Sequence, residues 1–137
     1  MKHAKVLLVI MAVSAIALLS GCSSQQSQVF KTISPDEAYR LIQENANNPD
    51  FVIIDIRTPQ EYKAGRIPNS INIDYYSPTF REKLDKLDKS KTYLIYCRTG
   101  HRTGNTMPVM KELGFQKVYE IRGGITAWAS KGYPVVK

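Results

Sequence analysis

The chain has 137 residues, of which 43% are hydrophobic and 23% are charged, and its formal net charge is +7. This length accommodates one domain, and the apolar content excludes a disordered protein. Basic residues interleave with acidic ones, as in residues 81–86, and no basic stripe alternates with aromatic residues, so the composition indicates no nucleic-acid partner.

The start of the chain is typical of an export signal. Lys2 and Lys5 form a short basic start, and the run from residue 6 to residue 19 is apolar except for Ser14. This run is shorter than the roughly 18–20 residues that cross a bilayer comfortably, and its length is typical of a signal-peptide core. We expect residues 1–21 to be removed, which lowers the net charge from +7 to +5 because they contain two lysines and no acid. A retained membrane anchor is the alternative.

The end of this segment, Leu19-Ser20-Gly21-Cys22, resembles the lipobox of bacterial lipoproteins. The resemblance implies cleavage before Cys22 and a lipid on its thiol. Residues 22–29 then form the lipidated start and a polar, flexible tether. We expect a lipid-anchored protein of the cell envelope that faces the periplasm or the cell exterior; Ser23 favours the outer membrane where a cell has two membranes. A plain secreted protein is the alternative.

The remainder, residues 30–137, begins with a strand at 28–33 and a helix from 35 to about 45. Ser34 can cap this helix, Pro35 suits its first position, and Glu37 completes a capping box. The continuous apolar run 51–56 is typical of a strand that is buried on both faces of a parallel sheet.

The middle of the domain continues the alternation of strands and helices. A short helix is expected at 59–64, ended by Gly65, and a short strand at 71–73. Apolar residues at a spacing of three to four predict a helix at 78–87.

The run 92–96 repeats the buried-strand pattern and ends directly on Cys97. We expect a helix from about 103 to 113, kinked or late in starting because Pro108 lacks a backbone donor. A last strand at 117–121 and a helix at 125–130, with Trp128 facing inward, complete an α/β domain. We expect three layers, with a mainly parallel sheet between helices on both faces.

The chemistry is expected where the strand 92–96 turns into a helix, because ligand sites in such sheets lie beyond the carboxyl ends of the strands. Since a lipid would occupy Cys22, Cys97 is the only free thiol. Loop N–H groups, the positive end of the helix and two arginines, Arg98 and Arg102, favour a thiolate and a bound anion there. The alternative is an inert, buried cysteine.

Four motifs resemble those of the rhodaneses. Residues 97–102 resemble the Cys-x-x-Gly-x-Arg active loop of that family, and residues 123–128 resemble its closing Gly-Gly-x-x-x-Trp. Residues 55–57 and 61–62, with the run 65–72, resemble its Asp-x-Arg, Glu-Tyr and Gly-His-Ile-Pro-Gly-Ala stretches. Arg66, Asn69 and Ser70 replace the usual His, Gly and Ala.

The resemblance implies a single-domain sulfurtransferase that forms a persulfide on Cys97. The expected partners are thiosulfate or a related small anionic donor and a thiol or cyanide-like acceptor, which can be a protein; no cofactor or metal is expected. Residues of the loop and of the helix start are expected to bind the substrate: Arg98, Thr99, Gly100, His101, Arg102 and Thr103.

Asp55, Arg57 and Glu61 are expected to brace the loop rather than to react. His101 is either a local charge or proton donor, or a solvent-facing residue.

Three other activities are compatible with parts of the pattern. A phosphatase or arsenate reductase uses Cys-x5-Arg, but Thr103 stands where that arginine is needed. A lipid-anchored sulfur carrier or partner-docking module without free thiosulfate activity has the same sequence features as the enzyme. A thiol–disulfide enzyme is disfavoured because no resolving cysteine accompanies Cys97.

Overall fold

The computed structural model describes residue 21 and residues 26–137. The expected signal peptide, apart from Gly21, and the expected lipid-bearing Cys22 lie outside the described residues. Within the described part, no helix is long and apolar enough to cross a membrane.

A five-stranded sheet forms the centre of the domain, with the strand order β1-β5-β4-β2-β3. All of its neighbouring strands are parallel. Its strands are β1 (Val29–Ile33), β2 (Phe51–Asp55), β3 (Ile71–Asn72), β4 (Thr92–Tyr96) and β5 (Lys117–Ile121). The helices are α1 (Pro35–Glu44), α2 (Pro59–Ala64), α3 (Phe80–Asp85), α4 (His101–Glu112) and α5 (Gly124–Ser130). The predicted α/β class with a parallel sheet is confirmed.

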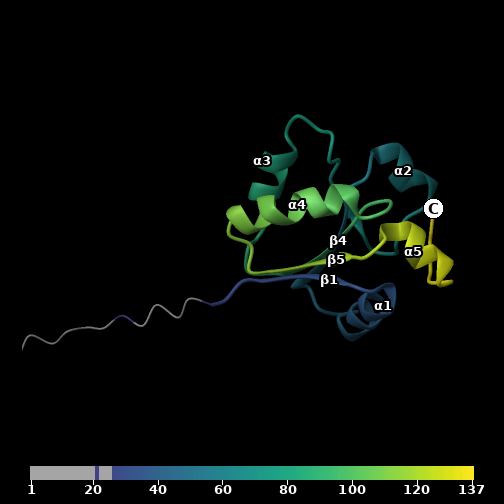
Figure 1. Ribbon diagram of the computed structural model, residues 1–137, viewed down its shortest axis with the longest axis horizontal. Coiled ribbons are helices and arrows are strands. Elements are labelled where there is room, and N and C mark those ends of the chain that lie inside the picture. Colours follow the sequence, from purple (N-terminus) through teal and green to yellow (C-terminus); the bar gives the residue numbers. More distant parts are fainter. Residues whose placement is uncertain (1–20, 22–25) are drawn as a thin grey trace, which may run out of the picture.

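Helices cover both faces of the sheet, with α3 and α4 on one side and α1 on the other (Figure 1). Side chains of β4 alternate between the two faces, as expected for a strand of period two. Tyr93 and Ile95 join the core beneath α3 and α4, whereas Leu94 and Tyr96 join the core shared with α1 and α5. Cys97 follows Ile95 on the α4 side.

The ends of the domain are tied by specific contacts. Ser34 and Glu37 form the predicted capping box at the start of α1, with N···O distances of 3.2 and 2.8 Å. Trp128 is buried, as predicted, and its indole N–H donates to the carbonyl oxygen of Pro134 at 2.9 Å.

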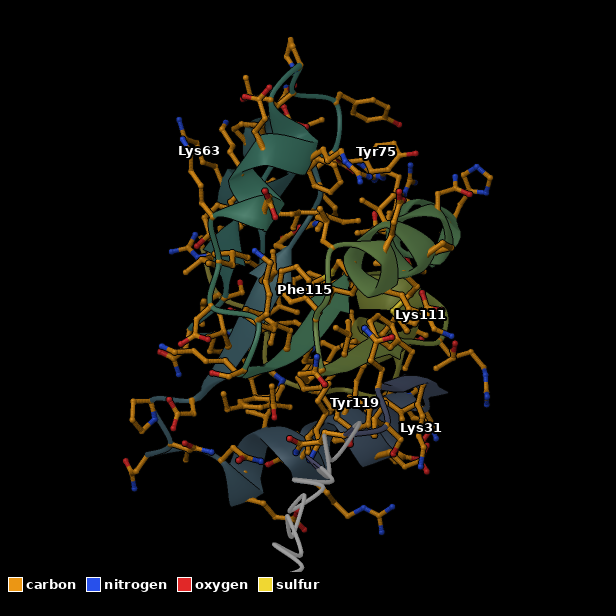
Figure 2. All side chains as sticks on the ribbon, turned by 90° about the vertical axis from the view of Figure 1, so that its left-hand side faces the viewer. Lys31, Lys63, Tyr75, Lys111, Phe115 and Tyr119 are labelled. Atoms are coloured by element: carbon orange, nitrogen blue, oxygen red, sulfur yellow. The ribbon has the colours of Figure 1, made fainter. Side chains whose placement is uncertain are left out.

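Phe115 lies in the core on the α4 side of the sheet, with its ring edge to face with that of Tyr93 (Figure 2).

Two predicted helix boundaries are wrong. Helix α4 begins at His101, earlier than expected, because Gly100 adopts φ 102° and turns the chain directly into the helix. Pro108 is accommodated inside α4; the carbonyl that loses its donor belongs to Gly104, which is exposed. Helix α3 spans only Phe80–Asp85, because successive turns occupy the chain before it, with Ser77 N–H donating to Asp74 O and Phe80 N–H to Ser77 O.

Candidate active site

The thiol of Cys97 lies at the carboxyl end of β4, and the residue is 1% exposed. The backbone N–H of Gly100 donates to its Sγ at 3.1 Å. The hydroxyl of Thr103 lies 3.7 Å from Sγ and donates to Gly100 O at 3.1 Å. The sulfur therefore lies within a short loop that the first turn of α4 closes. Helix α4 has twelve residues, and the positive end of its dipole points towards the sulfur. This arrangement places the Gly100 N–H and the start of α4 beside the sulfur.

The loop that carries Cys97 is held from outside by the start of α5. Ile125 N–H donates to Cys97 O at 2.9 Å, and Thr126 N–H donates to Arg98 O at 3.1 Å. These bonds fix two loop carbonyls on the side of α5, while the N–H of Gly100 is directed at the sulfur. The closing Gly-Gly motif noted in the sequence therefore has a positioning role that the sequence did not reveal.

Gly124 permits this close approach. Its φ is +59°, and a β-carbon added there would collide with the carbonyl oxygens of Cys97 and Arg98. We expect Gly124→Ala to lower the free energy of unfolding by about 2–4 kcal/mol, from the left-handed backbone and the clash together. Urea denaturation measures this loss.

Gly114→Ala is the matched control, because Gly114 has φ +91° but nothing within 4 Å of an added β-carbon. It should show only the backbone cost of about 1–2 kcal/mol. Equal losses in the two variants would contradict the close packing of Gly124 against the loop.

A bidentate ion pair ties α2 to the first turn of α4. Arg102 donates from Nη1 and Nη2 to the two carboxylate oxygens of Glu61, both at 2.9 Å. Glu61 also accepts from the backbone N–H and hydroxyl of Thr58, completing a capping box on α2. The guanidinium of Arg102 lies 5.6 Å from the ring centre of Tyr76, which is largely exposed. The charge of Arg102 is thus already matched by a carboxylate.

The hydrogen bonds from Arg102, opposed by burial and assisted by those from Thr58, lower the pKa of Glu61 to about 2. An unfolded glutamate has its ordinary value near 4.5. Ionised Glu61 therefore stabilises the fold above pH 4.5, and this contribution is lost as the pH falls from 4.5 to 2.

We expect Glu61→Gln to lower the free energy of unfolding at pH 7 by about 1–2 kcal/mol, after solvent screening of a partly exposed pair. The difference between variant and parent should shrink between pH 4.5 and 2. Urea denaturation at several pH values measures it, and a difference that is constant down to pH 2 would be contrary to the assigned pairing.

Asp55 and Arg57 form a second, buried ion pair at the end of β2. The residues are 0% and 7% exposed, and Arg57 Nη2 lies 2.7 Å from Asp55 Oδ2. Arg57 also donates from Nε and from its backbone N–H to Asp55 Oδ1, at 3.0 and 2.9 Å. The side-chain amide of Asn72 bridges the carbonyl oxygens of Asp55 and Arg57. The pair joins the ends of β2 and β3 beside the loop and does not contact the sulfur.

The other predicted substrate-binding residues form the loop after Cys97 and the first position of α4. Arg98, Thr99 and His101 are exposed, and Gly100 is partly buried and adopts a left-handed conformation. In residue 21 and residues 26–137, no group of three His, Cys, Asp or Glu is placed to hold a metal ion. The site can therefore present one buried nucleophilic sulfur, a hydrogen-bond donor aimed at it, and an exposed arginine beside it.

Comparison with known proteins shows which family the domain resembles. Residues 34–131 match the model of the rhodanese-like domain family. A sulfurtransferase of Allochromatium vinosum is 34% identical over 96 residues, which span 70% of this chain and 88% of the relative. A tRNA uridine(34) hydroxylase of Legionella pneumophila is 36% identical over 99 residues, 68% of this chain but only 37% of that protein. A solved structure of a rhodanese-related protein from Thermoplasma volcanium matches at a TM-score of 0.64 and 32% identity, covering 77% of this chain and 97% of that one.

Proposed function

The chain belongs to the rhodanese-like domain family, and on this premise we propose that it is a sulfurtransferase whose nucleophile is Cys97. It moves a sulfane sulfur from thiosulfate or a related anionic donor to a thiophilic acceptor. The observation that carries this proposal is the position of Sγ at the end of β4, where Gly100 N–H donates to it at 3.1 Å.

The reaction has two half-reactions. The Cys97 thiolate attacks the outer sulfur of thiosulfate, the sulfur–sulfur bond of the donor breaks, and sulfite leaves with the bonding electron pair. Cys97 then carries a persulfide, whose negative charge the Gly100 N–H and the start of α4 stabilise. An acceptor attacks the outer sulfur, and Sγ leaves as the thiolate.

The surrounding residues support this chemistry without reacting. The Arg102–Glu61 pair holds the first turn of α4 against α2, and the Asp55–Arg57 pair, with Asn72, braces the ends of β2 and β3. Because the charge of Arg102 is matched by Glu61, Arg98 supplies the attraction for the anionic donor. Thr103, buried beside Sγ, closes the loop by donating to Gly100 O.

Steady-state kinetics test the proposal. With thiosulfate as donor and cyanide as acceptor, covalent transfer predicts parallel lines in double-reciprocal plots, because sulfite leaves before cyanide reacts. Thiocyanate formation is the readout. Intersecting lines would indicate that donor and acceptor bind together, contrary to a persulfide intermediate.

We also propose that the domain of residues 30–137 is tethered to a membrane of the cell envelope through lipid on Cys22. The basic start, the apolar run and the small residues before Cys22 support this location. Partition of the full chain into detergent, lost in Cys22→Ser, is the expected result; equal partition of both forms would contradict lipidation.

A further inference from the structure

The two edges of the parallel sheet carry different parts of the chain. Every strand begins at one edge and ends at the other, because all neighbouring strands are parallel. Strand β1 begins with Val29, whereas Cys97 directly follows the end of β4. At about 3.3 Å per residue, the five residues of β4 place roughly 17 Å between these edges. In Figure 1 the start of β1 and the turn from β4 into α4 lie at opposite ends of the molecule.

Hydrogen bonds fix the point at which the chain enters the sheet. The side-chain amide of Gln28 donates to Lys111 O at 3.1 Å and to Phe115 O at 2.8 Å. Val29 N–H donates to Gln116 O at 2.7 Å. The start of β1 is therefore held against the last turn of α4 and the turn that follows it, so the preceding segment joins the domain at the amino edge of the sheet.

Three exposed lysines surround this entry point. Lys31 lies in β1, Lys117 is paired in register with Val29, and Lys111 lies in the last turn of α4. None of their ammonium groups is within 4.0 Å of a carboxylate in the part of the chain that the structure describes. These three lysines define the lysine edge, which Figure 2 views end on, with Lys31 and Lys111 labelled.

Two carboxylates lie beside these lysines, and one of them is already paired. Glu112 follows Lys111 in the chain, but it pairs with Arg81 at 3.4 Å. Glu44 lines a pocket together with Lys31 and balances one positive charge. The lysine edge therefore keeps an excess of positive charge, which is complementary to a surface of anionic lipid headgroups.

We propose that the lysine edge faces the anionic headgroups of the membrane that holds the lipid of Cys22, and that Cys97 points away from that membrane. This inference rests on the lipid tether proposed above. Residues 22–28 span at most about 25 Å, so they keep the lysine edge near the headgroups. Each lysine close to an anionic surface strengthens the attraction roughly fivefold, so the three lysines select this orientation among those that the tether permits.

The orientation decides which molecules reach the thiol. Exposed basic residues are also present at the opposite edge, among them Lys63, Arg122 and Lys137, but they meet the membrane only if the domain turns over. With the lysine edge on the headgroups, Cys97 stands roughly 17 Å or more above them. Sulfur donors and acceptors then reach Cys97 from the aqueous space, and molecules held within the bilayer do not.

Energy transfer to the membrane measures the orientation. The full chain, purified with its lipid, is bound to phosphatidylcholine vesicles with or without phosphatidylglycerol, each carrying a trace of dansyl-labelled phosphatidylethanolamine, and is recovered by flotation. Trp128, the only tryptophan of the chain, is the donor, and it lies in α5 at the edge opposite the lysines. Transfer falls steeply with distance, so it reports how close that edge comes to the headgroups.

Two triple variants with the same net charge are compared with the parent, and all six positions are exposed. The lysine-edge variant combines Lys31→Glu, Lys111→Glu and Lys117→Glu. The control variant changes the opposite edge and combines Lys63→Glu, Arg122→Glu and Lys137→Glu.

We expect severalfold less transfer from the parent on vesicles with phosphatidylglycerol than on phosphatidylcholine alone. The lysine-edge variant should lose this difference, because anionic headgroups then repel the edge that they attract in the parent. The control variant should keep the parent's low transfer.

Equal transfer from the parent and the lysine-edge variant on phosphatidylglycerol vesicles, with both proteins floating, would overturn the orientation while leaving the lipid tether intact. Failure of the parent to float with either kind of vesicle would overturn the tether and the orientation with it. Neither result bears on the sulfurtransferase, which thiocyanate formation measures separately.

Discussion

Cys97→Ser is expected to lower thiocyanate formation from thiosulfate and cyanide at least about 10³-fold, as the loss of a covalent nucleophile does in other enzymes. A serine hydroxyl stays protonated at neutral pH. Among residues 26–137, the hydrogen-bonding groups at Sγ are the Gly100 N–H, a donor, and the hydroxyl of Thr103, which itself donates to Gly100 O. Neither of these groups is a base that could activate serine.

The substitution is nearly isosteric, so the variant should fold. Its urea midpoint, compared with that of the parent, checks this point. A folded Cys97→Ser protein that retains more than a few per cent of the parent rate would contradict the role of Cys97 as nucleophile.

Asp55→Ala is expected to cause the largest loss of stability, about 3–5 kcal/mol, because it leaves the guanidinium of Arg57 buried without its carboxylate and, among residues 26–137, with only the carbonyl oxygen of Gly65 to accept from it. This is a large part of the 5–15 kcal/mol that is typical for the unfolding of a whole domain. Urea denaturation measures the loss in the free energy of unfolding.

Two further variants serve as controls for Asp55→Ala. Glu112→Ala breaks the exposed pair with Arg81, whose N···O distance is 3.4 Å, and should cost less than about 1 kcal/mol. Asp55→Val combined with Arg57→Leu removes both buried charges and should recover part of the loss. Equal costs for Asp55→Ala and Glu112→Ala would show that Arg57 finds solvent or another partner once Asp55 is gone.

Much of the fold could be predicted because its signals are local. The capping box at Ser34 and the apolar runs 51–56 and 92–96 depend on neighbouring residues alone, and the elements they predict are present. The start of α4 could not be placed in the same way. It depends on the positive φ of Gly100, and a glycine in a sequence is compatible with many backbone conformations.

The sequence predicts where Cys97 lies in the fold, but it predicts fewer of the contacts that surround it. The sequence places Cys97 at the end of a buried strand and arginines after it. It does not show that Arg102 is matched by Glu61, a residue 41 positions earlier, or that the start of α5 holds the loop through Gly124. Such contacts depend on how helices meet across the sheet, which one sequence does not reveal. Arg98 is therefore the arginine beside the sulfur that no carboxylate of residues 26–137 pairs with.

Intact mass spectrometry of the full chain, before and after incubation with thiosulfate, tests the central claim most directly. A persulfide on Cys97 predicts a stable gain of one sulfur atom that cyanide removes and that Cys97→Ser does not show. A folded protein with a free Cys97 thiol that gains no sulfur from thiosulfate would contradict thiosulfate sulfurtransferase activity.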